Sequence, residues 1–304
     1  ANRARAAAEA RMRIASDMTY NDLDLVQLAE SPGEPRLGPH KLVPHPSDDE
    51  LEGFSLRCAV TGEEFTFTSQ EELKRFKYQR YLQKYLQCVH SVDENVGRLL
   101  DYLDESGLAE NTVVIYTSDQ GFYLGEHGWF DKRFIYEESF RMPFIVRYPE
   151  LVTAGSVNTD MVSNVDFAQT FLDVAGLPQP NYMQGRSIRP LLAGQTPDDW
   201  TDLAYHRYWM NQDSIHNAYA HYGIRTHEYK LIYWYDEDCG EEGASPGTDE
   251  PEWELFDLRK DPLEINNVYA DPAYAEVVKA MTAKLEAEML RIGDTPMHEL
   301  QTAG

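Results

Sequence analysis

The sequence predicts an α/β fold, in which helices flank part of a doubly wound mixed sheet and a smaller C-terminal α+β subdomain follows. Three observations support this class. A long helical pattern at 69–107 leads into a short β-branched run at 112–117, and a second strand-like run follows at 143–148. Beyond residue 196 the chain changes to short aromatic runs separated by polar turns. We therefore expect two domains, residues 1–196 and 197–304.

The N-terminal stretch holds a helical pattern and then an irregular segment. Residues 1–30 are rich in Ala, Arg and Leu, and we expect a helix that Ser31-Pro32-Gly33 ends. Residues 31–62 are rich in Pro and Gly, and their acidic cluster at 48–50 is expected to face water rather than bind a metal. Because the sequence begins at Ala1 inside a helical pattern, we expect a fragment of a longer protein.

The longest predicted helix begins at Ser69, a favourable N-cap residue, and ends at Gly107. Apolar residues recur along it at helical spacing. We expect this stripe, with Cys88 and His90 on it, to pack in the core and to cover the strand at 112–117 in a right-handed helix–strand unit.

The run at 112–117 is expected to form a strand buried on both faces, as in a parallel sheet. Asp119 and Gln120 follow at its carboxyl end, where open α/β sheets bind their ligands. A polar loop separates this strand from the next one at 143–148, and such loops usually hold the chemistry. A helix with one apolar face is expected around 167–174.

The C-terminal part predicts an antiparallel sheet with one helix against it. An acidic, Gly-rich segment at 237–252 is expected to be a mobile loop, because it has no apolar core to bury. The expected strands are 204–210, 219–225, 229–235 and 253–258, and the expected helix is 272–292.

Charge and composition exclude several classes of protein. The formal net charge is −25, which opposes binding to nucleic acid or to an anionic membrane but permits a small anionic substrate beside a metal ion. No apolar run reaches the roughly 18 residues of a membrane span. The three cysteines fit neither a disulfide framework nor a zinc site. The sequence is compatible with a cytoplasmic location and with export by a signal outside this sequence. It does not determine the oligomeric state.

Several short segments around the polar loop resemble the sulfatase family, within the alkaline-phosphatase superfamily. The resemblance is nearest to members that act on sulfated amino sugars, and it extends over nearly all of this chain but only the C-terminal portion of a whole sulfatase. The segments are Asp119-Gln120-Gly121, Gly125-Glu126-His127-Gly128, Lys132, Tyr136-Glu137-Glu138-Ser139, Met142-Pro143 and the Glu254–Asn267 pattern.

The resemblance implies roles for individual residues. Asp119 and Gln120 would be ligands of a divalent cation, Ca²⁺ or otherwise Mg²⁺, because carboxylate and amide oxygens are hard donors. Lys132 would contact the sulfate group. His127 would either orient a metal ligand or the oxyanion, or anchor the glycine-flanked loop. The candidates for contacting the sugar are His221, Arg225 and His206, each of which could instead be a packed or surface residue.

The nucleophile that the family uses is not found in this sequence. Sulfatases convert a Cys or Ser within Cys/Ser-x-Pro/Ala-x-Arg to formylglycine, and none of Cys58, Cys88, Cys239 or the serines lies in such a motif. The family's early Asp-Asp metal pair is absent as well. We therefore expect the formylglycine in an N-terminal part, and no hydrolysis by residues 1–304 alone.

Three hypotheses follow for the function. The first is the hydrolysis of a sulfate ester of a sugar by a longer enzyme that includes this chain. The second is a phosphodiesterase or phosphonate monoester hydrolase of the same superfamily. The third is a non-catalytic fragment or binding module. In each case we expect residues 1–304 alone to expose a sheet edge or an apolar face.

Overall fold

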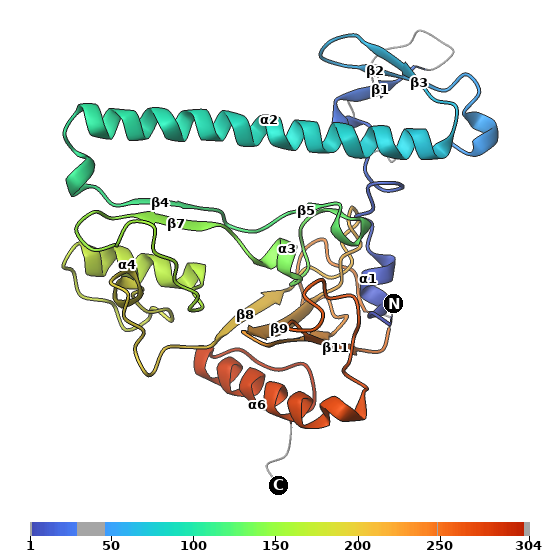
Figure 1. Ribbon diagram of the computed structural model, residues 1–304. Coiled ribbons are helices and arrows are strands. Elements are labelled where there is room, and N and C mark those ends of the chain that lie inside the picture. Colours follow the sequence, from blue (N-terminus) through green and yellow to red (C-terminus); the bar gives the residue numbers. More distant parts are fainter. Residues whose placement is uncertain (1, 29–45, 248, 301–304) are drawn as a thin grey trace. The chain divides into compact units, whose positions relative to one another are not determined.

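The computed structural model describes residues 2–28, 46–247 and 249–300, and it has the predicted mixed α/β character. The helices are α1 (Arg5–Glu9), α2 (Gln70–Glu105), α3 (Glu137–Phe140), α4 (Phe167–Val174), α5 (Arg189–Leu192) and α6 (Ala275–Ile292) (Figure 1). The strands are β1 (Leu25–Gln27), β2 (Ser55–Cys58), β3 (Glu64–Thr66), β4 (Val114–Thr117), β5 (Tyr123–Leu124), β6 (Phe130–Asp131), β7 (Phe144–Arg147), β8 (Leu203–Tyr208), β9 (His221–Thr226), β10 (Tyr229–Trp234) and β11 (Glu252–Asp257).

The chain forms two compact units, which are described separately. The first unit comprises residues 1–10, 107–121 and 133–304, and the second comprises residues 11–106 and 122–132. The chain therefore leaves the first unit after Gly121 and returns to it at Arg133. The domain boundary expected near residue 196 lies inside the first unit and stays a prediction.

The C-terminal part of the first unit is the predicted antiparallel sheet with one helix. Its strands lie in the order β11-β10-β9-β8, and every neighbouring pair is antiparallel. All four strands were expected within a few residues of their observed ends, because alternating aromatic and polar residues bounded by turns are a local signal. Helix α6 ends at Gly293, whose φ of 77° is a left-handed conformation that glycine adopts without strain.

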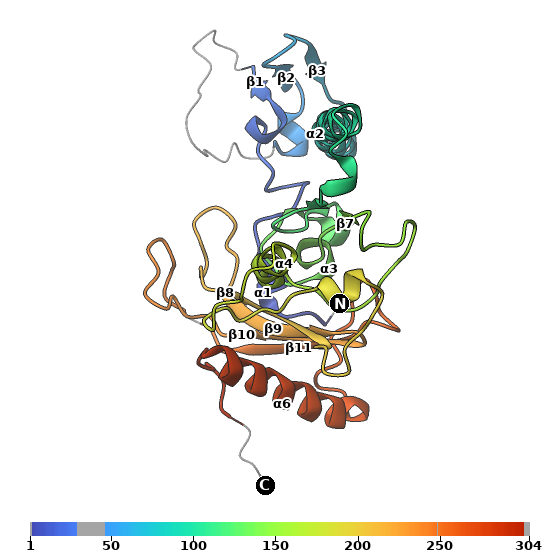
Figure 2. The ribbon, with the colours of Figure 1, turned by 90° about the vertical axis from the view of Figure 1, so that its left-hand side faces the viewer.

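The two faces of this sheet have different chemistry. Side chains alternate between the faces along each strand, so Leu231 and Tyr233 share one face of β10 while Lys230 and Trp234 share the other. The Leu231 face packs with α6 in an apolar cluster. Figure 2 shows α6 on this side of the sheet and α3 on the opposite side. The face toward α3 therefore holds Lys230 and Trp234.

Strands β4 and β7 confirm the two predicted strands but not the expected burial. They pair with each other, antiparallel, and within the described residues each has one hydrogen-bonded neighbour. Their side chains stay partly exposed, and Ile145 is 64 % exposed. The expectation of a strand buried on both faces was wrong for this chain, because no second neighbour pairs with β4 in the described part.

The second unit contains the predicted long helix and a small core. Ser69 caps α2 by accepting a hydrogen bond from the amide of Glu72, as its type predicts. Strands β1, β2 and β3 form a three-stranded antiparallel sheet, and an apolar cluster that includes Leu25, Leu56 and Leu73 lies within the unit.

The N-terminal helix is shorter than expected. Within residues 2–28 only α1 is an α-helix, and a 3-10 turn and β1 follow it. The long helix predicted over 1–30 was therefore wrong, because β1 pairs with β2, a contact that local sequence patterns do not reveal. Residues 29–45 of the expected irregular segment lie outside the described residues. Asp49 and Glu50 are exposed, as expected for a solvated acidic cluster.

The apolar stripe of α2 is buried only near its start. Leu73, Phe76 and Tyr81 belong to the core of the second unit or pack against it, whereas Leu99 is 65 % exposed. Cys88 and the His90 side chain are also exposed. The expectation that the whole stripe forms a core was wrong for these residues, because the small core of their unit meets only the first turns of the helix.

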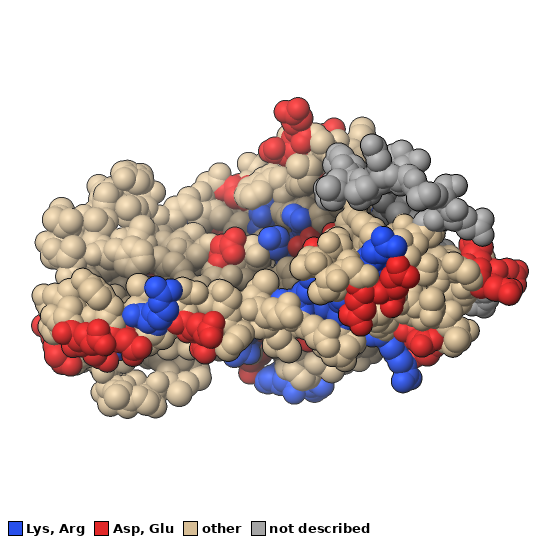
Figure 3. Space-filling model, turned by 90° about the horizontal axis from the view of Figure 1, so that it is seen from above, with Lys and Arg blue, Asp and Glu red and all other residues tan. Residues whose placement is uncertain are grey.

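Charged side chains are spread over the surface. Figure 3 shows the acidic residues in several separate groups on the visible face rather than in one cluster. Charged residues also recur along α2, the longest helix. Within the described residues no helix has the length and apolarity needed to cross a bilayer.

The apolar face between α6 and the sheet should provide much of the stability of the first unit. Leu285 is fully buried in this cluster. We predict that Leu285→Ala lowers the free energy of unfolding by about 2–5 kcal/mol, because it removes buried methyl groups and leaves a cavity. Urea denaturation would measure the change. Leu290→Ala is the control, because Leu290 lies on the same helix but is 83 % exposed. An equal loss in both variants would contradict this packing.

Candidate active site

The predicted metal ligands lie directly after β4. Asp119 is exposed, Gln120 is half-buried, and the Ser118 hydroxyl donates a hydrogen bond of 3.3 Å to Asp119 Oδ1. A carboxylate and an amide oxygen side by side suit a hard cation such as Ca²⁺ or Mg²⁺ and suit zinc poorly. No group of three or more His, Cys, Asp or Glu side chains in the described ranges could hold a metal. The assignment of Asp119 and Gln120 as metal ligands stays a prediction, and a calcium ion would need further oxygen donors beside them.

The backbone after this pair is fixed by α3. The amide of Gly121 donates a hydrogen bond of 2.7 Å to the carbonyl of Ser139. A Cβ atom at residue 121 would lie 2.0 Å from the Glu138 carbonyl oxygen, so only glycine allows this close approach of two backbones. This contact between two backbone segments, which requires glycine at residue 121, thus sets the direction of the chain after Gln120.

Lys132 and His127 belong to the loop in the second unit that contains β5 and β6. These two strands pair, and Glu126 accepts a hydrogen bond of 2.7 Å from the amide of Leu124. His127 adopts a left-handed φ of 58° between two glycines, and its half-buried ring packs near Tyr123 and Trp129. Lys132 follows β6 and is half-buried.

His206 and His221 are brought together on the sheet face toward α3. Their ring centroids are 5.5 Å apart, and the fully buried His221 also packs against Trp234. Nδ1 of His221 lies 2.8 Å from the carbonyl oxygen of Tyr219. Nε2 of both imidazoles is buried, and neither atom has a hydrogen-bond partner among the described residues.

Both histidines are held in the neutral form at neutral pH. Burial lowers the pKa of His206 to about 4, and the charge of Lys230 contributes. Burial also lowers the pKa of His221 to about 3, with a further contribution from His206. The Tyr219 carbonyl can only accept, so Nδ1 of the neutral His221 ring carries the proton and its buried Nε2 is an acceptor.

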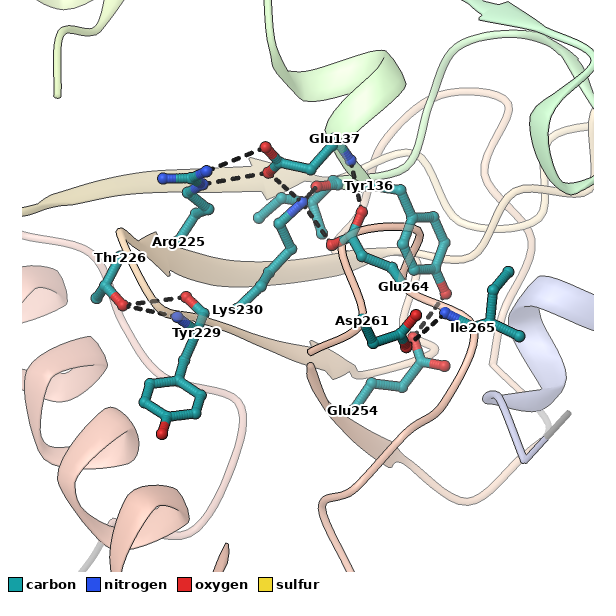
Figure 4. Close-up of polar contacts among 11 residues, drawn as sticks. Tyr136, Glu137, Arg225, Thr226, Tyr229, Lys230, Glu254, Asp261, Glu264 and Ile265 are labelled. Carbon is teal, nitrogen blue, oxygen red and sulfur yellow. Dashed lines mark hydrogen bonds and ion pairs between the residues drawn. The ribbon is translucent and has the colours of Figure 1, made fainter. Parts of the chain in front are cut away.

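Arg225, the third predicted sugar contact, is part of a charged network (Figure 4). Its guanidinium forms two hydrogen bonds of 3.1 and 3.2 Å with the Glu137 carboxylate. Lys230 is fully buried, and its ammonium lies 2.8 Å from Glu137 and 2.7 Å from Glu264. The same ammonium donates to the carbonyl of Ile135 at 2.7 Å. Two cations and two carboxylates therefore balance one another beneath α3.

The network also caps α3. The Glu264 carboxylate accepts a hydrogen bond of 2.7 Å from the amide of Glu137, the first residue of that helix. Burial alone would raise the pKa of Glu137, but Lys230 and Arg225 lower it to about 2. Burial raises the pKa of Glu264, so this carboxyl takes up a proton before Glu137 as the pH falls.

A second carboxylate anchors the residue before α3. The Tyr136 hydroxyl and the Trp234 indole nitrogen both donate to Glu254 Oε2, at 2.7 and 3.1 Å. The other oxygen of Glu254 accepts from the amide of Ala4 at 2.7 Å. Figure 4 shows Tyr136 reaching down to Glu254 from the segment that leads into α3. The start of α3 is thus attached to the C-terminal part twice, through Glu137 to Glu264 and through Tyr136 to Glu254.

Arg133, directly after Lys132, enters a further cluster that was not predicted. Its Nη2 atom lies 3.2 Å from Nε2 of His216, and Nδ1 of His216 lies 2.9 Å from Asp213. Burial would raise the pKa of Asp213, but hydrogen bonds from His216 hold it well below its usual range. Neither Asp213 nor His216 lies in a segment that resembles the family, so no sequence signal indicated them. Glu137 and Glu264 did lie in such segments.

Profiles of two protein families match the chain. The profile described as N-sulphoglucosamine sulphohydrolase, C-terminal, matches residues 125–291, and the sulfatase profile matches residues 37–177. The chain belongs to the sulfatase family. The recognition made from Asp119, Gln120, the Gly125–Gly128 loop and Lys132 is therefore confirmed.

Individual sulfatases and related enzymes show the same relationship. An N-acetylglucosamine-6-O-sulfatase of Bacteroides thetaiotaomicron is 46% identical over 229 residues, which are 75% of this chain and 39% of that protein. The multifunctional alkaline phosphatase superfamily protein PehA of Trinickia caryophylli is 31% identical over 66% of this chain and 38% of its own length. The chain thus spans about two fifths of these relatives.

Two solved structures have the same fold. A protein in complex with its substrate D-glucosamine-2-N,6-O-disulfate superimposes with a TM-score of 0.77 at 38% identity, covering 96% of this chain and 58% of that one. The phosphonate monoester hydrolase of Agrobacterium radiobacter superimposes with a TM-score of 0.61 at 25% identity, covering 77% and 45% of the two chains. The α/β class expected from the sequence is therefore that of solved members of this superfamily.

Removing the buried ammonium should destabilise the first unit strongly. We predict that Lys230→Met lowers the free energy of unfolding by about 3–5 kcal/mol, because Glu137 and Glu264 would remain buried without their shared cation. The control is Lys284→Met, which breaks an exposed ion pair with Asp202 and should cost at most about 1 kcal/mol. Urea denaturation compares them, and a loss for Lys230→Met no larger than for the control would contradict the network's role.

The buried histidine pair should make the fold sensitive to acid. The pKa of a histidine in the unfolded chain is about 6.5, whereas burial lowers the pKa of His221 in the fold to about 3. As the pH falls from about 6.5 toward 3, this histidine binds a proton in the unfolded state but not in the folded state. The free energy of unfolding therefore falls by about 1.4 kcal/mol per pH unit. We predict that His221→Phe reduces this slope by about 1.4 kcal/mol per pH unit, the contribution of one proton.

Melting temperatures between pH 4 and pH 7 would test the effect of His221. His90→Phe is the matched control, because the His90 side chain is 73% exposed beside Glu94. The slope should stay that of the wild type in this control. An unchanged slope in His221→Phe would show that the imidazole is not excluded from protonation in the fold.

Proposed function

We propose that this chain is part of an enzyme that hydrolyses a sulfate ester of a sulfated amino sugar. The observation that supports it most is the placement of Asp119 and Gln120 at the end of β4, with Lys132 closing the loop that follows. The relative at 46% identity is an N-acetylglucosamine-6-O-sulfatase, and the structure with a TM-score of 0.77 binds a disulfated glucosamine. Both point to an amino sugar as the substrate.

In this proposal Asp119 and Gln120 hold a divalent cation, and Ca²⁺ is the ion their oxygens suit best. A bound cation would stabilise negative charge on the sulfate oxygens. The Lys132 ammonium would bind a further sulfate oxygen and stabilise the charge that grows as the ester bond breaks. His127 would orient these groups from its strained, glycine-flanked position.

We propose that His206, His221 and Arg225 form the sugar side of the site. The buried Nε2 atoms of the two histidines support this, because such polar atoms usually meet a ligand or water when no protein group binds them. Arg225 would act through Glu137, with which it forms two hydrogen bonds. The nucleophile would be a formylglycine outside residues 1–304, since no Cys or Ser of this sequence lies in the required motif.

A second function has a specific observation in its favour. PehA is a multifunctional protein at 31% identity, and a phosphonate monoester hydrolase shares the fold at 25% identity. A phosphodiester or phosphonate monoester also presents charged oxygens to a cation and a lysine. The same site could therefore act on such esters, and an assay must separate the two substrate classes.

The whole enzyme should be assayed on glucosamine 6-sulfate, on an aryl sulfate and on matched phosphodiester and phosphonate esters. We predict that the sulfate esters are the better substrates and that chelation of calcium abolishes turnover. Lys132→Ala should lower kcat/KM about 10²- to 10³-fold, because one donor to the developing charge is lost. Lys279→Ala is the control, because Lys279 is exposed on α6.

Faster turnover of the phosphorus esters would favour the second function. Binding of the sulfated sugar without turnover of any ester would favour a binding module. The polypeptide 1–304 by itself should hydrolyse none of these compounds, and turnover by it would contradict the need for a nucleophile outside it.

A further inference from the structure

Ser139 touches both ends of the loop that joins the predicted metal ligands to Lys132. The chain leaves the first unit after Gly121 and returns at Arg133. The carbonyl oxygen of Ser139 accepts from the amide of Gly121 at 2.7 Å. Its hydroxyl oxygen accepts from the amide of Arg133 at 3.3 Å. One buried residue therefore holds the peptide that follows Gln120 and the peptide that follows Lys132.

The contact at Gly121 leaves no space for a side chain. A Cβ atom there would lie 2.0 Å from the Glu138 carbonyl oxygen and 2.8 Å from that of Arg141. Any side chain would push this segment away from α3, and it would move Asp119 and Gln120 with it. The end of the loop at the metal ligands is thus fixed by backbone packing alone.

The contact at Arg133 is fixed by a different set of groups. Arg133 has a φ of 121°, which is strained for a residue with a side chain and persists only where its surroundings hold it. Arginine can only donate, so Nε2 of His216 accepts from the guanidinium and the imidazole proton lies on Nδ1, toward Asp213. The Asp213 carboxylate therefore fixes the tautomer that receives Arg133.

Ser139 is itself held by the charged network beneath it. Ser139 lies in α3, whose first amide is capped by Glu264 and whose first side chain, Glu137, is paired with Lys230 and Arg225. The amide of Ser139 also bonds to the carbonyl of Tyr136 at 3.0 Å. The C-terminal sheet therefore fixes the position of Ser139, and through Ser139 it fixes both ends of the loop.

We propose that Ser139 and His216 are positioning residues that hold Gly121 and Arg133, the residues directly after the metal-ligand pair and directly after Lys132. This inference rests on the proposed roles of Asp119, Gln120 and Lys132. Ser139 fixes both ends, and His216, oriented by Asp213, fixes the Arg133 end. Neither side chain needs to touch the substrate.

This arrangement predicts that the two ends of the loop can be disturbed separately. Gly121→Ala should lower calcium affinity about tenfold or more, because it displaces the segment that bears the ligands. Ser139→Ala and His216→Ala should each weaken binding of inorganic sulfate about three- to tenfold, because each loses one hydrogen bond that holds Arg133. These two variants keep the backbone bond to Gly121, so their calcium affinity should stay that of the wild type.

The experiment is calorimetric titration of the whole enzyme with calcium, and then of the calcium-loaded enzyme with inorganic sulfate. His216→Gln should recover most of the lost sulfate affinity, because its amide offers both an acceptor and a donor. The matched controls are Ser156→Ala and His90→Ala, in which an exposed serine and an exposed histidine are removed. Both controls should bind calcium and sulfate as the wild type does.

Wild-type sulfate affinity in both Ser139→Ala and His216→Ala would overturn the proposal. A parallel loss of calcium and sulfate affinity in these variants, with no recovery in His216→Gln, would also overturn it and indicate general destabilisation. Both titrations are independent of turnover. If the wild type binds both ions and hydrolyses no sulfate ester, the proposed function fails while the positioning is still tested.

Discussion

The buried ammonium of Lys230 is the constraint on which the rest of the first unit depends. An ammonium without partners in a protein interior costs several kcal/mol, so its neighbours must present oxygen atoms to it. Glu137, Glu264 and the carbonyl of Ile135 do so at 2.7–2.8 Å. These three partners come from the start of α3, from the turn after β11 and from the segment before α3. One charge on β10 thereby fixes two separate parts of the chain, residues 135–137 and the turn after β11.

The candidate site takes its geometry from this network through short, directional contacts. The alternation of side chains along β9 and β10 places Arg225 and Lys230 on the face away from α6. That face holds α3, and α3 presents Ser139 to Gly121 and Arg133. The residues proposed for chemistry are thus supported by residues that have no chemical role. This is the usual relation between a functional group and its surroundings in enzymes.

Features set by neighbouring residues were predictable from the sequence, and features set by distant residues were not. Ser69 and Gly107 mark the ends of a helix by their own conformational preferences, and the strands of the C-terminal sheet show their alternation locally. The pairing of Glu137 with Lys230 joins positions far apart in the chain, and no periodicity reveals it. The same holds for β1, which replaced an expected helix, and for Cys88, whose apolar stripe has no core beside it in its unit. The candidate site residues were named mainly because a family pattern marked them, and their roles stay predictions.

The most direct test of this account is hydrogen exchange at single-residue resolution in the whole wild-type enzyme. The amides of Gly121 and Arg133 both donate to Ser139, so both should exchange more slowly than the amides of an open loop. Exchange of the Arg133 amide at the rate of an open loop, with Gly121 still protected, would show that Ser139 holds only one end and would contradict the central claim.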